Sequence, residues 1–120
     1  SLDWVEEHLK HLDVYEGISI GYPAIDTLKI VNALNEVLST LPRKDVWTVQ
    51  TPQLFRREVL IKAHKRALLE SVVGTDDLSL LESMGASVAV FMGDRHNIKV
   101  TTPFDLIVGE AIVALKALKE

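Results

Sequence analysis

Apolar residues recur at helical spacing near both ends of the chain. Residues 2–12 place leucines and a valine on one face and charged side chains on the other, which predicts a short surface helix ending before Gly17. A second apolar stripe covers residues 103–118. Thr102 is a good N-cap, a proline suits the first helical position, and Asp105 completes a variant capping box, so this helix is the clearest prediction.

Two more helices are predicted between these. One begins at Thr51-Pro52, because proline is favoured at the first helical position, and its apolar face covers residues 54–68. The other begins after Thr75, a suitable N-cap followed by two aspartates, and ends before Gly85.

Short apolar stretches bounded by turn residues predict strands at residues 18–22, 46–49, 88–91 and 98–101. Strands that alternate with helices indicate an α/β sheet. Residues 28–41 are ambiguous, because their apolar positions fit a helix period slightly better, whereas two asparagines suit a turn between short strands.

The composition is that of one ordinary globular domain, with 120 residues of which 48% are hydrophobic and 25% charged. The net charge of -4 argues against a nucleic-acid partner. The absence of cysteine excludes disulfides and thiolate metal sites and suits a reducing cytoplasm, where we expect the protein. No apolar run or signal-peptide pattern predicts a membrane segment. The chain begins with Ser1, which we interpret as a cut or processed end.

Polar groups gather in three loops that follow predicted strands, at residues 26–27, 75–77 and 97–101. Ligands of open α/β sheets bind beyond the carboxyl ends of the strands. Arg43 and Lys99 are the cations best placed to meet an anion there, although from these features alone a solvated surface position explains each of them better.

Other motifs with a known chemistry are missing. The chain has no Walker loop, dinucleotide fingerprint, metal-binding helix motif or nucleophile elbow. His8 and His11 share a helix face at a spacing that metals use, but a solvated face explains them better, so no metal site is predicted in this chain. Asp26 and Asp76 are interpreted as turn and cap residues.

Four segments together resemble the 2-C-methyl-D-erythritol 4-phosphate cytidylyltransferase family. They are PAIDTLK at 23–29, RKDVWTVQTPQLF at 43–55, TDD at 75–77 and NIKVTTPFDL at 97–106. The second is the most specific, since it matches the family's Arg…Trp…Gln-Thr-Pro-Gln-x-Phe run. Their order and spacing argue against coincidence.

The resemblance implies a fold and an assembly. Residues 1–120 would form a single partial domain, the C-terminal portion of a Rossmann-like nucleotidyltransferase sandwich. Residues 28–41 would form a protruding β-arm that reaches into the partner subunit of a homodimer, so we expect a hairpin there against the helical period.

The implied reaction is cytidylyl transfer from CTP to 2-C-methyl-D-erythritol 4-phosphate, which gives CDP-methylerythritol and pyrophosphate for isoprenoid precursor synthesis. By resemblance, Arg43 holds the substrate phosphate and Lys99 lies near the reacting phosphates. Thr27 is a second phosphate-side group, supplied with Arg43 across the dimer interface. Thr75 contacts the methylerythritol, and Thr51 lies in the same pocket, where helix capping would explain it equally well.

The family's glycine-rich CTP loop and its magnesium-binding acidic residue have no counterpart here. We therefore expect this chain alone to be inactive, to expose a sheet edge, and to rely on an absent N-terminal half for Mg²⁺. Two alternatives stay open: a ribitol-5-phosphate cytidylyltransferase, and a non-catalytic dimerisation domain. The Trp-containing strand after Arg43 favours the methylerythritol enzyme over the first, and the retained Arg43, Thr75 and Lys99 argue against the second.

Overall fold

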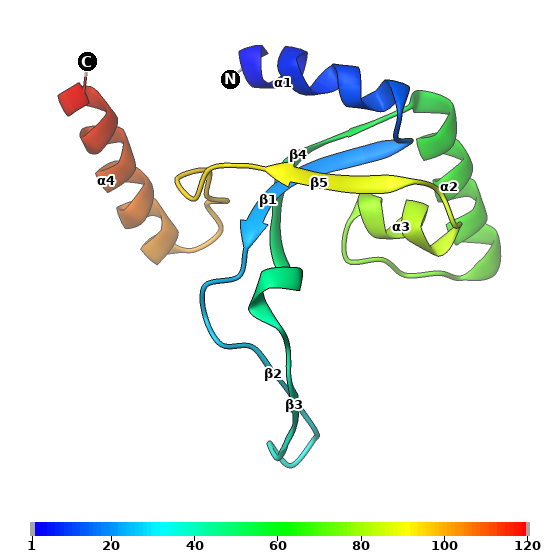
Figure 1. Ribbon diagram of the computed structural model, residues 1–120, viewed down its shortest axis with the longest axis horizontal. Helices are drawn as coiled ribbons and strands as arrows, with labels where there is room; N and C mark the ends of the chain where they lie inside the picture. The colour runs from blue at the N-terminus through cyan, green and yellow to red at the C-terminus, as the bar shows by residue number, and fades with distance from the viewer. Residues whose placement is uncertain (1, 120) are drawn as a thin grey trace. The chain divides into compact units, whose positions relative to one another are not determined.

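The computed structural model (Figure 1) describes residues 2–119. The chain divides into two compact units. The first unit contains residues 1–20 and 51–91, and the second contains residues 21–50 and 92–120. The elements are α1 (Leu2–Leu9), the 3₁₀ helix η1 (Lys10–Asp13), β1 (Gly17–Pro23), β2 (Lys29–Val31), β3 (Val37–Thr40), the 3₁₀ helix η2 (Arg43–Asp45), β4 (Trp47–Phe55), α2 (Arg57–Glu70), α3 (Asp77–Ser83), β5 (Val88–Met92) and α4 (Pro103–Lys119).

Strand β1 lies between β4 and β5 in a three-stranded sheet, so β4 and β5 are its outer strands within residues 2–119. Its residues 17–21 are buried without interruption, as is typical of a central strand covered on both faces. Gly21 permits the tightest approach, because a Cβ there would clash with the backbone carbonyl of Thr48 on β4.

Hydrogen bonds between main chains fix the strand directions. Residue numbers rise together along β1 and β5, which makes this pair parallel, and they change in opposite senses along β1 and β4, which makes that pair antiparallel. The bonds concerned are Gly17 N–H to Ser87 O, Gly93 N–H to Gly21 O, Ala24 N–H to Val46 O and Arg56 N–H to Glu16 O.

The predicted helix start at Thr51-Pro52 is wrong. Both residues lie inside β4, which continues to Phe55, and α2 begins only at Arg57. Proline suits the first turn of a helix and also suits an outer strand, since neither position needs its missing N–H group. The explanation of Thr51 as a helix-capping residue is therefore also wrong, because Arg56 is the N-cap of α2.

The core of the first unit lies between α2 and α3, which pack side by side (Figure 1). Val59 and Ala63 of α2 contact Leu80 and Leu81 of α3, with Phe55 of β4 packed against the cluster. The apolar face predicted for the helix after Thr51 is confirmed through Ala67, although Leu68 at its end is 85% exposed. The helix after Thr75 was predicted from its end signals, and its existence is also confirmed.

Helix α3 begins one residue later than predicted. Its N-cap is Asp76 and not Thr75, and Asp76 forms a reciprocal capping box with Ser79. The interpretation of Asp76 as a cap residue is therefore confirmed, while that of Thr75 as the N-cap is wrong. Gly85 follows the helix with a φ of +78°, where glycine is favoured, as the sequence predicts for this end.

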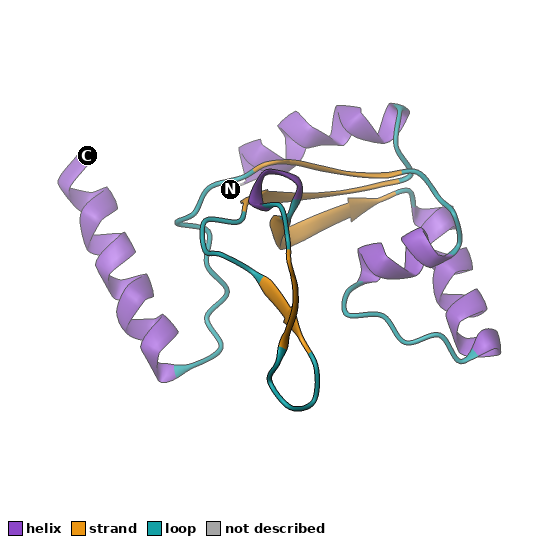
Figure 2. Ribbon diagram, turned by 60° about the horizontal axis from the view of Figure 1, so that its bottom comes forward, coloured by secondary structure: helices purple, strands orange, loops and turns teal. Residues whose placement is uncertain are grey.

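In the second unit, the ambiguous segment forms a hairpin. Strands β2 and β3 pair antiparallel, and Figure 2 shows the loop that joins them. Asn32 accepts hydrogen bonds from the backbone N–H groups of Leu34 and Glu36, and Asn35 adopts a left-handed φ of 63°. The expectation of a hairpin is therefore confirmed. The spacing of apolar residues that favoured a helix was misleading, because both faces of the two strands are exposed and the apolar residues do not mark a buried face.

Helix α4 begins at Pro103 as predicted, but the strand predicted at residues 98–101 is absent, because that segment is a loop. Ile98 and Val100 lie near Gly109 of α4 and pair with no neighbouring strand. None of the described residues of α4 is buried, and Phe104 is 70% exposed. Within residues 2–119, no helix combines the length and apolar character needed to cross a membrane.

Candidate functional site

Arg43 is hydrogen-bonded to the segment that precedes the hairpin and carries Thr27. Arg43 opens η2 directly after Pro42, and its Nη1 donates a 2.7 Å hydrogen bond to the carbonyl oxygen of Ile25. Ile25 precedes Thr27 by two residues, and both Thr27 and Arg43 are exposed. The remaining guanidinium N–H groups and the threonine hydroxyl are a suitable donor set for a phosphate.

Lys99 lies on an exposed loop between β5 and α4. The first part of this loop is anchored by Gln50 of β4, whose side-chain amide donates to the carbonyl oxygens of Asp94 at 2.6 Å and Asn97 at 2.9 Å. Gln50 opens the Gln-Thr-Pro-Gln run, but no role was predicted for its side chain. Its position shows that this run on β4 supports the backbone that carries the candidate lysine.

The second part of the loop is fixed at the start of α4. Asp105 accepts hydrogen bonds from the N–H and hydroxyl of Thr101 and from the N–H of Thr102. The Thr102 hydroxyl in turn accepts from the Asp105 N–H at 3.1 Å, which completes the predicted capping box. The bonds from Thr101, first its backbone N–H and then its hydroxyl, lower the pKa of Asp105 below its ordinary value.

The second unit also contains a hollow of about 620 Å³. Ile25, whose carbonyl binds Arg43, contributes to one wall, and residues 92–96, which lead toward Lys99, contribute to another. Tyr22 and Pro23 complete the lining, and the Arg95 guanidinium lies 5.9 Å from the centre of the Tyr22 ring. The hollow therefore has the size of a small-molecule site and cations near its walls.

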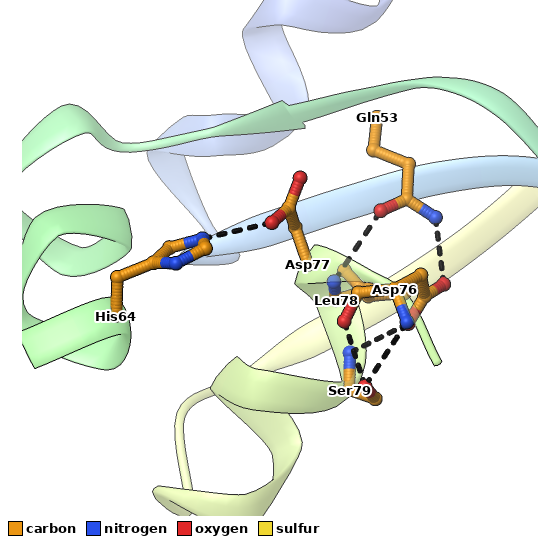
Figure 3. Close-up of polar contacts among 6 residues, drawn as sticks. All are labelled: Gln53, His64, Asp76, Asp77, Leu78 and Ser79. Carbon is orange, nitrogen blue, oxygen red and sulfur yellow. Dashed lines mark hydrogen bonds and ion pairs between the residues drawn. The ribbon is translucent and has the colours of Figure 1, made fainter. Parts of the chain in front are cut away.

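In the first unit, Thr75 lies exposed directly before the N-cap of α3. Figure 3 shows the polar contacts of the residues that follow it in the chain. Gln53 of β4 donates to a carboxylate oxygen of Asp76 at 2.8 Å and accepts from the Leu78 N–H at 3.3 Å. The next carboxylate, Asp77, turns instead to His64 of α2, at 2.8 Å.

The five predicted site residues thus fall into two sets. Thr27, Arg43 and Lys99 belong to the second unit, and Thr51 and Thr75 belong to the first. Thr51 is exposed on β4, two residues before Gln53. Convergence of all five on one ligand stays a prediction. The sequence analysis missed the residues that support them, Gln50 and Gln53, which lie far along the chain from the loops they hold.

No three His, Asp or Glu side chains among residues 2–119 gather closely enough to hold a metal ion. His8 and His11 are instead engaged with aromatic rings: His8 stacks on Trp4 with ring centres 4.3 Å apart, and His11 stacks on Phe91 at 3.8 Å.

The sheet and the helices that alternate with its strands along the chain define an α/β protein. Solved structures with this fold include a 4-diphosphocytidyl-2C-methyl-D-erythritol synthase from Anaerococcus prevotii, at 28% identity and a TM-score of 0.86 over 95% of this chain and 51% of that one. A 2-C-methyl-D-erythritol 4-phosphate cytidylyltransferase from Francisella tularensis matches at 31% identity and a TM-score of 0.80, over 93% and 53%.

The sequence model of the family IspD, 2-C-methyl-D-erythritol 4-phosphate cytidylyltransferase, matches residues 3–115, and the chain belongs to this family. Relatives of that name include proteins from Caldanaerobacter subterraneus, 43% identical over 88% of this chain and 47% of the relative, and Bacillus licheniformis, 38% identical over 98% and 51%. The chain therefore spans about half the length of these relatives. The family resemblance and the α/β fold class are both confirmed.

Proposed function

We propose that this chain supplies the sugar-phosphate side of an enzyme that transfers a cytidylyl group from CTP to 2-C-methyl-D-erythritol 4-phosphate. The observation that carries the proposal is the family match over residues 3–115, which includes all five candidate site residues. The local geometry is compatible with it, because a hollow of about 620 Å³ is lined by Ile25, whose carbonyl accepts from Arg43, and by residues 92–96 of the loop that continues to Lys99.

The chemistry requires positioning and charge neutralisation. A phosphate oxygen of methylerythritol phosphate attacks the α-phosphorus of CTP, and a new phosphorus–oxygen bond forms. The bond from that phosphorus to the bridging oxygen breaks, and pyrophosphate leaves with its electron pair. Because the attacking phosphate is already an anion, no general base is needed, which fits candidate residues that are cations and hydroxyls.

Each candidate residue takes a separate role in this proposal. Arg43 binds the phosphate of the polyol substrate, and Thr27 donates a hydroxyl to it. Lys99 neutralises charge at the reacting phosphates as a point charge. Thr75 binds the methylerythritol, and Thr51 lies in the same pocket. Arg43 and Thr27 act on the site of a partner subunit, which the hairpin arm of residues 28–41 reaches in a homodimer.

We place the CTP site and the Mg²⁺ that accompanies it outside this chain. The described residues 2–119 contain no metal-binding cluster, so no step above depends on a metal held by them. Mg²⁺ would neutralise the triphosphate when it is bound. We also propose that the enzyme works in the cytoplasm, and that this chain without its other half has no turnover.

The test is turnover by the full-length gene product with CTP and either methylerythritol phosphate or ribitol 5-phosphate, followed by pyrophosphate release. We expect methylerythritol phosphate to be the preferred substrate. A preference for ribitol 5-phosphate would identify the related cytidylyltransferase, and no turnover with either would favour the non-catalytic dimerisation domain.

Two substitutions test the site assignment. Arg43→Ala and Lys99→Ala are each expected to lower kcat/KM for methylerythritol phosphate by roughly a hundredfold or more, because each removes charge stabilisation of the phosphates. Lys44→Ala and Lys116→Ala are matched controls that also remove an exposed cation, and we expect near-parental rates. Near-parental kinetics in both site variants would refute the assignment.

A further inference from the structure

The side-chain amide of Gln53 joins strand β4 to the start of α3, 23 residues further along the chain (Figure 3). Its Nε2 donates to the Asp76 Oδ2 at 2.8 Å, and its Oε1 accepts from the Leu78 N–H at 3.3 Å. The other Asp76 oxygen, Oδ1, accepts from the Ser79 N–H at 2.8 Å. Gln53 and Asp76 are both partly buried, so water competes weakly for these bonds.

The direction of every bond in this cluster is fixed by its partners. The backbone N–H groups of Leu78 and Ser79 can only donate a hydrogen bond, so each must face an oxygen atom. The Gln53 Oε1 and the Asp76 Oδ1 accept these two bonds. The Gln53 Nε2 and the Asp76 Oδ2 remain, and they face each other. An amide nitrogen opposite a carboxylate oxygen satisfies this pair, whereas two donors or two ionised acceptors would not.

We infer that Gln53 is a positioning residue, which acts through Asp76 to set the place of Thr75. The inference rests on the proposed function, in which Thr75 binds the polyol phosphate. Thr75 is exposed and directly precedes Asp76, so hydrogen bonds that hold Asp76 in place also restrain the adjacent backbone of Thr75. The same strand carries Thr51, so the amide also sets the position of Thr75 relative to the strand that bears a second candidate residue.

Single substitutions should break this arrangement in opposite ways. Gln53→Glu keeps an oxygen for the Leu78 N–H but places two carboxylates against each other. Asp76→Asn keeps an oxygen for the Ser79 N–H but places two NH₂ groups against each other. We expect each variant to raise the KM for methylerythritol phosphate by about tenfold, because a misplaced contact weakens binding of that substrate. The KM for CTP should stay within about twofold.

The double variant Gln53→Glu/Asp76→Asn reverses donor and acceptor and should restore the cluster. The amide introduced at position 76 would donate to the carboxylate introduced at position 53, both main-chain N–H groups would keep their oxygens, and the summed charge of the pair would be unchanged. We expect the KM for methylerythritol phosphate to return to within about twofold of the parental value. Asp77→Asn is the matched control, because it removes a neighbouring carboxylate that pairs with His64 and not with Gln53.

All variants are made in the full-length gene product and analysed with both substrates. Parental KM values in the single variants, equal losses for CTP and methylerythritol phosphate, or a double variant as impaired as either single would each overturn the inference. A loss of the same size in Asp77→Asn would also overturn it, since the effect would then follow charge and not the Gln53 bond.

Failure of the proposed function can be told apart from failure of this inference. If the parental protein does not turn over methylerythritol phosphate, the proposed function fails, and with it the substrate role of Thr75. Amide hydrogen exchange at Leu78 and Ser79 then decides whether the Gln53–Asp76 bond holds the loop. Faster exchange in both single variants and recovery in the double variant would support the positioning role, and unchanged exchange would refute it.

Discussion

At the scale of single residues, the carboxylate of Asp105 offers a direct test of the loop that carries Lys99. The bonds from Thr101 lower the pKa of Asp105 below 3.8. Because the pKa of Asp105 is lower in the folded state, its ionised carboxylate contributes fully to the stability of the folded state above pH 3.8. This contribution is lost as the pH falls through the lower pKa of the folded state. An NMR titration of the Asp105 carboxyl carbon should therefore have its midpoint below 3.8.

The Thr101→Val variant checks the cause of that shift. It removes the hydroxyl donor but keeps the backbone N–H, so we expect the Asp105 midpoint to move upward while remaining below the unfolded value. Thr48→Val is the control, because Thr48 is exposed on β4 and takes no part in the capping box. An unchanged midpoint in Thr101→Val would show that the hydroxyl bond is not formed in solution.

Residue-scale structure is predictable from the sequence where the partners are close along the chain. Thr102 and Asp105 are three residues apart, and their capping box is found as expected. Thr75 and Asp76 are both good N-caps, and local preference does not choose between them. The structure favours Asp76, which is also bonded to Gln53 on a distant strand, and that contact cannot be read from the sequence around α3.

At the scale of elements, the hairpin turn depends on the left-handed backbone of Asn35, whose φ is 63°. Asparagine tolerates this conformation and a β-branched residue does not, so Asn35→Val should destabilise the hairpin by roughly 1–2 kcal/mol. Amide exchange across residues 29–40 of the full-length protein measures this local opening. Asn35→Gly is the control and should keep parental protection, since glycine adopts positive φ freely.

Elements of this chain are predictable when one face is buried and one is solvated. Helix α2 has such a face and was predicted from it, whereas α3 was predicted from the residues at its two ends. The arm has apolar residues on both exposed faces, so its period carries no information about a core, and the family resemblance gave the correct hairpin. The Thr51-Pro52 pair misled for a different reason, because proline suits a helix start and an outer strand alike.

At the scale of the whole molecule, the exposed apolar residues of the arm predict an interface. Leu34 is 79% exposed and Leu38 is 63% exposed, which is unfavourable unless a partner covers them. If they are buried in the proposed homodimer, Leu34→Asp and Leu38→Asp should each weaken dimerisation by at least about tenfold. Sedimentation equilibrium measures the change, and Leu69→Asp, at an equally exposed position on α2, should leave it unaltered.

The location of a complete site is the property least predictable from this chain, because the candidate residues divide between two units and, as proposed, between two subunits. A site shared across a dimer makes a prediction that a site within one chain does not. Arg43→Ala and Lys99→Ala proteins should each have about one hundredth of the parental kcat/KM or less when alone. In a mixed dimer, one site would combine the intact Lys99 of one subunit with the intact Arg43 of the other.

Unfolding the two variant proteins together and refolding them should therefore restore about one quarter of the parental activity, since about half of the dimers are mixed and each mixed dimer has one intact site. Refolding each variant alone is the control and should restore only its residual activity. If Arg43 and Lys99 instead serve the same chain's site, every site in the mixture lacks one of them and the mixture keeps only the residual activity. Recovered activity would thus require that Arg43 reaches its substrate across the interface.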